Sequence, residues 1–475
     1  MTFSNKLRIF LVNIGYRRPL HPLVTPPLGL MYIAAYLREK HSISIELCNQ
    51  KLSRYSDKKL VQKIFVYKPH IIGLSAMTHS ADSLLWITNQ LHHILPDTWI
   101  IIGGPHASAI GKKLLSQCQA HAIVVGEGEI IFEKIVAAYP NLNDLEHIHG
   151  LITHQSKNVS LDHNHHCYLI KDLDSLPFPA YDLIPIKKYW KEQSMPPIPR
   201  RKYITLMSSR GCPFRCSYCH QIFGKQFRQH SPLRVVDEIA YYQRKFNIHD
   251  FEFVDDIFNL NKTFVFDFCD ELHRRNLHIK LAFPNGLRGD LLSTDMICAL
   301  ADAGMYFCAF AIESGSPRIQ QQMRKQLNIQ RCIDSIRIAQ NKGIYCHGFG
   351  MMGFPGETAD EMQMTIDIMA NSKLHTASFF TVTPLPGTDL FDQINQQSPG
   401  LLDTIKYKEF SDVSINLSAV DHQRFMQFKR NALKQVMMNT DRIKRIVLDF
   451  PQLHLLPLYF PEFLRRISQG LFHFR

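Results

Sequence analysis

Short apolar runs alternate with helix-like stretches through most of the 475-residue chain, and this alternation is the strongest constraint on its fold. Continuous apolar strands separated by helices predict a parallel sheet that is covered on both faces. Five such repeats predict a doubly wound, flavodoxin-like (Rossmann-type) α/β domain over residues 1–140. Its predicted strands are 7–12, 44–48, 71–75, 99–102 and 122–125, and its predicted helices are 28–38, 57–67, 80–95 and 129–139.

A second series of six β–α repeats over residues 201–396 is too short to close an eight-stranded TIM barrel, and the family resemblance given below implies a partial, TIM-like (β/α)6 barrel there. Residues 141–200 form a turn-rich connector with the polar tract 162–166, and residues 397–475 form a mainly helical C-terminal region. The predicted barrel strands are 203–207, 250–254, 279–283, 305–311, 344–350 and 377–381, with helical patterns that include 233–246, 262–274 and 330–342.

Three cysteines follow the first barrel strand at C-x3-C-x2-C spacing: Cys212, Cys216 and Cys219. Eleven cysteines occur in the chain, and no other two lie within five positions of each other. Thiolates select iron–sulfur clusters or zinc, so this loop is a candidate metal site. Three local ligands leave one metal corner open, which would let a cluster bind a substrate. The alternative is a zinc knuckle completed by His220 or His230.

The carboxyl ends of the predicted strands carry the other candidate residues, as both fold types lead us to expect. In the first domain, small and hydroxyl residues would let a large cofactor approach the backbone. The aspartate pair of the barrel could also be a helix N-cap, and its arginine could form a structural salt bridge. The first-domain candidates are Ser75, Thr78, Gly103, Gly104, Gly126 and Glu127, and the barrel candidates are Asp255, Asp256, Arg288, Glu313, Gly350 and Gly353.

The cysteine loop, with Tyr218 before its last cysteine, is similar to the signature of the radical S-adenosylmethionine (radical SAM) enzymes. The phrases at 310–315, 348–358 and 383–390 follow in the order of that family. Four phrases in the first domain resemble the cobalamin-binding domain found upstream of many radical SAM barrels, although the D-x-H-x-x-G motif is absent. These phrases are 25–37, 71–75, 102–106 and 125–129.

The resemblance implies a 4Fe–4S cluster on the three cysteines, S-adenosylmethionine on its open iron, and a 5'-deoxyadenosyl radical formed on reduction. It implies that Asp255 or Asp256 binds the amino group of S-adenosylmethionine and that Arg288 binds its carboxylate. Glu313 would bind the ribose hydroxyls, and the turn that contains Gly350 and Gly353 would contact adenine. Cobalamin would bind to the first domain without a histidine ligand.

The subgroup implied is that of the methyltransferases and the anaerobic magnesium-protoporphyrin ester cyclase-like enzymes. The favoured reaction is methylation of an unactivated carbon, with an external reductant such as flavodoxin or ferredoxin. Oxidative cyclisation or ring rearrangement is the second reading. A non-catalytic regulator that binds cobalamin or S-adenosylmethionine is a third, although three intact cysteines argue against it.

The C-terminal region carries much of the positive charge. The chain has a net charge of +12, and residues 421–475 hold ten Lys or Arg against four Asp or Glu, which is +6. Residues 421–446 predict one helix, with Phe425, Phe428, Ala432 and Val436 on one side and Arg424, Lys429, Arg430 and Lys434 largely on another. An aromatic, Pro-rich segment follows at 450–467.

This composition predicts either a helical cap on the barrel mouth or contact with an anionic membrane surface. An apolar lid indicates a hydrophobic small-molecule substrate. The dispersed basic residues and the lack of a recognition module argue against nucleic acid as a partner. With no run of eighteen apolar residues and no signal peptide, we expect a cytoplasmic protein, with peripheral contact to the inner membrane surface as an option.

Overall fold

The computed structural model describes residues 6–16, 23–141, 145, 147–156, 168–196, 198, 201–408, 412–451 and 457. The chain forms two compact units. The first contains Met1–Tyr189, His220–Arg228 and Leu385–Pro399, and the second contains Trp190–Cys219, Gln229–Pro384 and Gly400–Arg475. The polar tract 162–166 and nearly all of segment 450–467 lie outside the described residues.

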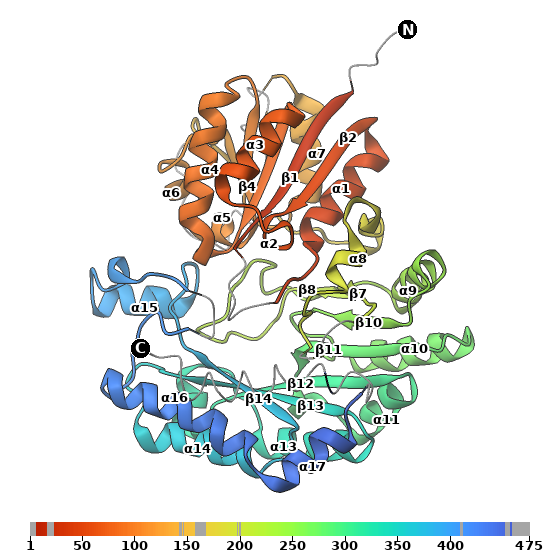
Figure 1. Cartoon of the computed structure of the whole chain (residues 1–475), viewed down its shortest axis with the longest axis vertical. Coiled ribbons are helices and arrows are strands. Elements are labelled where there is room, and N and C mark those ends of the chain that lie inside the picture. The colour runs from red at the N-terminus through yellow and green to blue at the C-terminus, as the bar shows by residue number, and fades with distance from the viewer. Residues whose placement is uncertain are drawn as a thin grey trace. The chain divides into compact units, whose positions relative to one another are not determined.

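The first unit is built on a six-stranded sheet in the order β2-β1-β3-β4-β5-β6. Figure 1 labels β1, β2 and β4 of this sheet. The five predicted strands and their parallel pairing are confirmed. The sixth strand, antiparallel to its neighbour, lies in the predicted connector, where three residues are too few to show a period. The strands are β1 (Leu7–Ile14), β2 (Ile43–Asn49), β3 (Ile71–Ala76), β4 (Trp99–Gly103), β5 (Ala122–Val124) and β6 (Leu151–Thr153).

Helices cover both faces of this sheet, which explains its unbroken apolar strands. Phe10, Ile72 and Ile100 belong to a buried cluster that includes residues of α3 (Asp57–Tyr67) and α4 (Ala81–Ile94). On the other face, a Cβ atom at Gly73 would meet Leu11 and Phe132, and Phe132 belongs to α7. The remaining helices are α1 (Leu28–Lys40), α2 (Gln50–Ser53), α5 (Gly104–Ile110), α6 (Lys112–Leu115), α7 (Glu129–Ala138), α8 (Ile186–Tyr189) and α15 (Asp389–Gln397).

The second unit contains the predicted partial barrel. Its six parallel strands run in the order β14-β13-β12-β11-β10-β7 (Figure 1). They are β7 (Ile204–Leu206), β10 (Asp250–Phe253), β11 (Lys280–Leu287), β12 (Met305–Glu313), β13 (Tyr345–Met352) and β14 (Thr376–Thr381). The outer helices are α9 (Pro232–Phe246), α10 (Lys262–Arg274), α11 (Thr294–Asp302), α12 (Pro317–Gln322), α13 (Ile329–Asn341) and α14 (Ala359–Asn371).

A buried charge cluster lies at the amino end of this sheet. Arg201 is fully enclosed and donates to Asp250 and Glu252, both at 2.7 Å. Thr205 of β7 also donates to Glu252, at 3.0 Å. A buried charge is tolerated only with such partners. These side chains occupy the amino end of the barrel, so the carboxyl end is the one available to a ligand.

The described part of segment 421–446 is divided between two helices, α16 (His422–Met437) and α17 (Thr440–Leu448), so the prediction of one helix over 421–446 is wrong. The first helix ends at Met437, and the Asn439 side chain accepts from the backbone of Asp441 and Arg442 to start the next. Asparagine is a preferred N-cap residue, so a new helix starts after Asn439 although apolar residues continue at helical spacing.

Lys429 is buried, so its predicted place on the polar side of the helix is also wrong. It follows Phe425 by four residues and precedes Ala432 by three, so it shares their face. Its Nζ donates to Thr381 Oγ1 at 2.5 Å. Burial lowers the pKa of Lys429 to about 8.

The described part of the tail packs on the barrel, against α14 and β14. Arg442 is fully buried and donates to the backbone oxygens of Met369, Ala370 and Ser372 at the end of α14. Asp449 accepts from His375 at 2.9 Å. These contacts satisfy helix-end carbonyls and a buried imidazole, and they fix the tail to the second unit.

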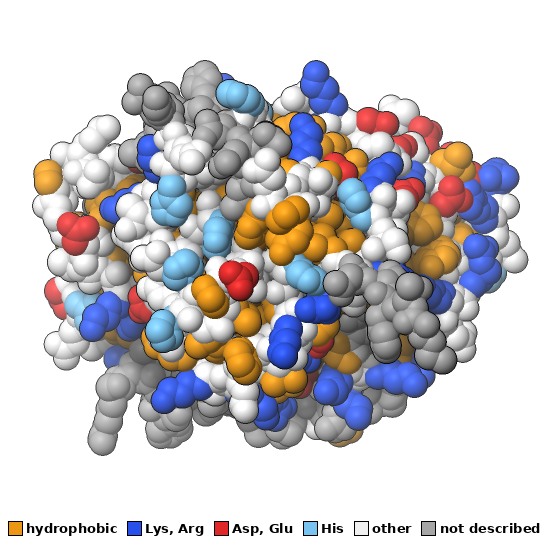
Figure 2. Space-filling view, turned by 90° about the horizontal axis from the view of Figure 1, so that it is seen from above, with side chains coloured by type: hydrophobic (Ala, Val, Ile, Leu, Met, Phe, Trp, Pro, Cys, Tyr) orange, Lys and Arg blue, Asp and Glu red, His pale blue; other side chains and the backbone are white. Residues whose placement is uncertain are grey.

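No helix among the described residues is long and apolar enough to cross a membrane. On the face seen in Figure 2, Lys and Arg side chains are scattered among apolar, histidine and acidic ones. The exclusion of nucleic acid as a partner stays a prediction.

The buried Lys429 generates a test of stability against pH. The unfolded chain keeps this proton up to about pH 10.5, while the folded protein releases it near pH 8, so its contribution to stability rises with pH between these values. Below pH 8 the buried ammonium costs about 3 kcal/mol. We expect Lys429→Met to raise the unfolding temperature at pH 7 and to flatten the rise between pH 8 and 10.5.

Lys434→Met, at an exposed position of the same helix, is the matched control and should leave the unfolding profile unchanged. An unaltered pH profile in Lys429→Met would show that Lys429 is not the titrating group.

Candidate active site

The cysteine loop lies in irregular backbone between β8 (Ser209–Arg210) and β9 (Arg228–Gln229). Cys212, Cys216 and Cys219 are partly exposed and free of disulfides. By contrast, six of the other described cysteines are buried, and burial raises the pKa of Cys269 and Cys332 to about 12. A buried thiol with a raised pKa stays neutral, so the three loop cysteines are the ones placed for metal binding.

Contacts on several sides hold this loop in place. The backbone N–H of Ser217 donates to the Met323 carbonyl at 2.9 Å. The ring of Phe214 lies 3.6 Å from the Arg288 guanidinium, and the ring of Tyr218 meets Phe354 edge-on at 5.9 Å. The cysteines are therefore presented by a braced loop.

The donor set fits a three-cysteine cluster. In a 4Fe–4S cluster each cysteine binds a different iron atom, so three thiolates can hold such a cluster.

The two adjacent aspartates after β10 lie in different surroundings. Asp255 is buried and accepts from the backbone and hydroxyl of Ser208, at 3.2 and 2.7 Å, and from the Ser209 hydroxyl, at 2.6 Å. Burial raises the pKa of Asp255 to about 6 against the lowering effect of these bonds. Asp256 is partly exposed. Asp255 therefore holds the turn that leads into the cysteine loop, and Asp256 is the better placed of the two for a ligand.

Glu313 ends β12 with a left-handed backbone, φ +65°, and is nearly buried. Lys325 Nζ donates to its Oε1 at 3.1 Å. Its Oε2 is buried without a hydrogen-bond partner among the described residues. Burial, the negative charge of Glu313 and a hydrogen bond to its carboxylate raise the pKa of Tyr218 well above its usual range. Lys325 and Tyr218 therefore both lie against this carboxylate, which has further acceptor capacity for a ligand hydroxyl.

The glycine turn after β13 is held by Glu357, which accepts from the backbone of Gly353 at 2.6 Å and of Phe354 at 3.1 Å. Gly353 is left-handed, φ +94°, and a Cβ atom there would approach Phe425 to 3.2 Å. A Cβ at Gly350 would meet Phe379 and Met369, so core packing already accounts for that glycine. Contact of either glycine with adenine stays a prediction.

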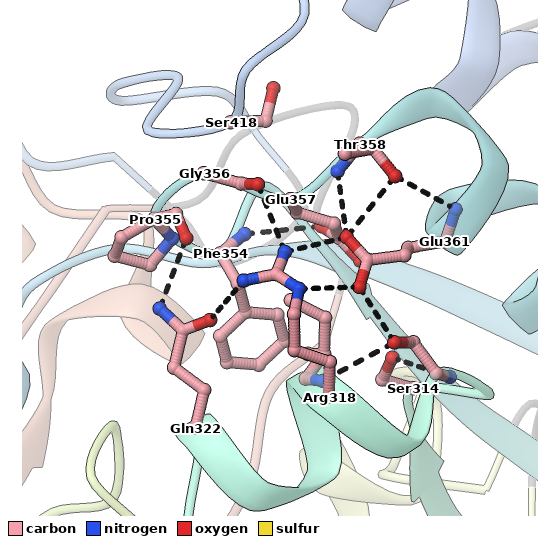
Figure 3. A network of polar contacts seen from close by, with 12 residues as sticks. Ser314, Arg318, Gln322, Phe354, Pro355, Gly356, Glu357, Thr358, Glu361 and Ser418 are labelled. Carbon is pink, nitrogen blue, oxygen red and sulfur yellow. Dashed lines mark hydrogen bonds and ion pairs between the residues drawn. The ribbon is translucent and has the colours of Figure 1, made fainter.

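A polar network links this turn to α12 (Figure 3). Arg318 donates to Glu361 at 2.6 Å and to the Gly356 carbonyl at 2.9 Å. Gln322 donates to the Pro355 carbonyl at 3.0 Å. The turns after β12 and β13 are thereby fixed to each other.

In the first unit the candidate residues lie where β3, β4 and β5 end. Gly104 is left-handed, φ +86°, and a Cβ atom there would clash with Ser75. Thr78 Oγ1 lies 3.3 Å from His106 Nδ1, and burial lowers the pKa of that histidine to about 4. The order β2-β1-β3 places the topological switch point at this edge.

The other residues of this edge differ in their contacts. Gly103 ends β4 and precedes the first turn of α5, and the backbone N–H of Gly126 donates to Ser108 Oγ. The hydroxyl of Ser80 is buried without a hydrogen-bond partner among the described residues. It is therefore available to accept a hydrogen bond from a polar ligand at this edge. This edge fits a large cofactor.

Glu127 has protein partners. Its carboxylate pairs with Arg228 at 2.7 Å and accepts from the backbone of Ile170 at 2.7 Å. Arg228 in turn donates to the Ile170 carbonyl at 2.7 Å. These bonds fasten the segment 220–228 to the first unit. Contact of Glu127 with cobalamin stays a prediction.

Sequence reasoning missed Lys325, Ser208, Ser209 and the structural use of Glu357. Lys325 stands between Arg324 and Gln326, both left-handed at φ +56° and +51°. No sequence pattern signals such a backbone in residues that are not glycine. The Ser-Ser pair before the Arg-Gly turn was visible, but its carboxylate partner is 46 or more positions away.

The contrast between the two aspartates generates a paired test. Asp255→Ala should lower the free energy of unfolding by about 2 kcal/mol, because the Ser208 N–H is left buried without an acceptor. Asp256→Ala should change that free energy by less than about 0.5 kcal/mol and weaken S-adenosylmethionine binding about tenfold. Chemical denaturation and calorimetric titration measure the two effects. Unchanged S-adenosylmethionine affinity in Asp256→Ala would remove that residue from the ligand site.

Comparison with known proteins agrees with this arrangement. The family model of the Radical SAM superfamily matches residues 206–369, and that of the B12 binding domain matches residues 22–136. The chain is 31% identical to the uncharacterized methyltransferase PH0819 of Pyrococcus horikoshii, over 82% of each protein. It is 24% identical to the anaerobic magnesium-protoporphyrin IX monomethyl ester cyclase of Rubrivivax gelatinosus, over 78% of this chain and 67% of that one.

The solved structure of the radical S-adenosylmethionine methyltransferase TsrM from Kitasatospora setae has the same fold. It superposes with a TM-score of 0.68 at 18% identity, and the match covers 83% of this chain and 77% of that one. The chain therefore belongs to the radical SAM enzymes that carry an N-terminal B12-binding domain, and its cofactors are a 4Fe–4S cluster, S-adenosylmethionine and cobalamin.

Proposed function

We propose that this enzyme transfers a methyl group to an unactivated carbon of a hydrophobic small molecule. The observation that carries the proposal is the relative of 31% identity, named a methyltransferase, which matches over four-fifths of both chains. The inner face of the barrel supports the apolar nature of the substrate.

That face follows from the strand register. Ala309 pairs with His347 and Ala311 with Phe349, and the next residue on this face of β13 is Met351, opposite Phe380. The other face carries Gly348, where a Cβ atom would meet Leu374 and Met369 on the helix side. The residues named on the first face therefore point away from the helices, because neighbours in register share a face.

The inner face is apolar and aromatic towards its carboxyl end. The side chains of Ala311, Phe349, Met351 and Phe380 are partly exposed, and the two phenylalanine rings lie 5.5 Å apart. His347 is tied to Thr376 Oγ1 at 2.6 Å and lies 3.1 Å from Ser378 Oγ. Such a wall favours a substrate with aromatic or aliphatic surface.

The chain's own residues would bind and orient the reactants. When bound, the cluster and cobalamin supply the radical and methyl-transfer chemistry. In this proposal Glu313 Oε2 accepts a ribose hydroxyl of S-adenosylmethionine, Asp256 binds its amino group, and the turn closed by Glu357 faces adenine. In the first unit, Ser75, Thr78, Gly103, Gly104 and Gly126 contact cobalamin.

The proposal includes an external electron donor, because radical SAM enzymes need a reductant and none of the cofactors named supplies one. A flavodoxin or a ferredoxin fits this role. The proposed location is the cytoplasm, with peripheral membrane contact through the C-terminal region as the finer form of the proposal. Its support is the exposed apolar side chains Ile443, Val447 and Leu448 on α17 beside the exposed Lys444.

Oxidative cyclisation of the porphyrin-ester type is the second candidate. It is favoured by the cyclase relative, which matches over 78% of this chain. A flat macrocycle would suit the same aromatic wall. The regulator alternative has less support. A protein that only binds cobalamin or S-adenosylmethionine has no use for a three-cysteine metal site with an open ligand position.

The test begins with anaerobic reconstitution, with about four irons and one cobalt expected per chain. The reduced protein is then given S-adenosylmethionine with a trideuterated methyl group and an apolar cell extract. Methylation predicts a product with the label and formation of 5'-deoxyadenosine, whereas cyclisation predicts an unlabelled product that has lost hydrogen.

Cys216→Ala should keep cobalt and form no 5'-deoxyadenosine, because the cobalamin-binding unit is separate from the cysteine loop. No cleavage of S-adenosylmethionine by the intact protein would point to the regulator. Zinc in place of iron would contradict the cluster.

A further inference from the structure

Arg288 was predicted to bind the carboxylate of S-adenosylmethionine, but its guanidinium contacts the cysteine loop. The guanidinium carbon lies 3.6 Å from the centre of the Phe214 ring. Phe214 stands in the three-residue stretch between Cys212 and Cys216. The Arg288 side chain is only 10% exposed, so the contact is largely shielded from water. A planar guanidinium against an aromatic ring is a favourable cation–π pair under these conditions.

The Nε and Nη2 donors of Arg288 are engaged within the protein. Nε donates to Asp290 Oδ1 at 2.9 Å, and Nη2 donates to the carbonyls of Lys325 at 2.9 Å and Gln326 at 3.1 Å. The backbone of Arg288 also exchanges two hydrogen bonds with Asn259, both of 3.0 Å. The Nε–Nη2 edge, which would form a fork to a carboxylate, is therefore already occupied.

The segment Met323–Gln326, which follows α12, contacts both Arg288 and the cysteine loop. Its first carbonyl accepts from Ser217, and its third and fourth carbonyls accept from Arg288. Two of its four residues are left-handed and are not glycine. Such a backbone persists only where surrounding contacts hold it, so this segment is a rigid support.

We propose that Arg288 and Phe214 form a brace that presses the cysteine loop onto the segment Met323–Gln326, and that Arg288 is a positioning residue for the cluster. This role differs from binding the carboxylate of S-adenosylmethionine. It rests on the cluster site of the family and holds for methylation and cyclisation alike.

The test measures the reconstituted holoenzyme without substrate. In Arg288→Met we expect the cluster to be lost to a chelator about tenfold faster than in the wild type, since the cation–π contact with Phe214 and the hydrogen bonds to the segment Met323–Gln326 are both removed. The dissociation constant of S-adenosylmethionine, measured on protein with an intact cluster, should stay within about twofold, because no contact to that ligand is lost. Phe214→Leu, which removes the cation–π contact alone, should also lose the cluster faster than the wild type.

Two further variants sharpen the comparison. The double variant Phe214→Leu/Arg288→Met should be no worse than Arg288→Met, since the arginine variant already lacks the contact that Phe214→Leu removes. Arg288→Lys should fall between wild type and Arg288→Met, because an ammonium keeps the charge and lacks the planar face. If Arg288→Met does not fold, the rates of cluster loss in Arg288→Lys and Phe214→Leu test the brace instead. Arg337→Met, at an exposed helix position, is the matched control for losing an arginine.

A wild-type rate of cluster loss in Arg288→Met would overturn the brace. Additive effects in the double variant would overturn it as well. A tenfold weaker S-adenosylmethionine affinity with a stable cluster would return Arg288 to the ligand site. Hydrogen exchange on metal-free protein gives a second readout, in which Arg288→Met should speed the exchange of the Ser217 N–H. None of these measurements needs a methyl acceptor, so they separate a failure of the brace from a failure of the proposed reaction.

Discussion

The parallel pairing of β7, β10, β11, β12, β13 and β14 is the constraint on which the site depends. The carboxyl ends of parallel strands lie at one edge of the sheet. Residues more than a hundred positions apart, such as Ser208 and Glu313, therefore lie at the same edge. The opposite edge is filled by Arg201 and its carboxylate partners. The candidate ligand-binding residues therefore lie in the turns that follow the strands.

Buried carboxylates at this edge serve two purposes, and their partners tell them apart. Asp255 and Glu357 accept hydrogen bonds from the turns beside them, so they shape the backbone. Glu313 pairs with Lys325 and lies beside the Tyr218 phenol, and its binding of a ligand hydroxyl is part of the proposal. Because an ionised carboxylate is costly to bury, each is retained only with such a role.

The C-terminal helices are joined to the barrel by polar groups that are buried with few partners. Lys429 reaches Thr381 at the end of β14, and Arg442 binds the carbonyls that end α14. Apolar residues alone would also cover this edge, but fixed hydrogen bonds set the position of α16 relative to the glycine turn, where Phe425 meets Gly353. The tail is therefore part of the site's framework.

The sequence by itself determined the parallel strands of the two sheets, the cysteine loop and the family, because periodicity and close spacing are local properties of the chain. It did not give the order of the strands or the antiparallel β6. It could not show that Asp255 bonds Ser208 or that Glu127 pairs with Arg228, since those partners are 47 and 101 positions apart. From the sequence we also predicted Lys429 on the polar side of a helix, and one helix where the structure has two. Only the tertiary structure decided which buried charges hold turns and which face a ligand, because that choice depends on distant groups brought within hydrogen-bond reach by the fold.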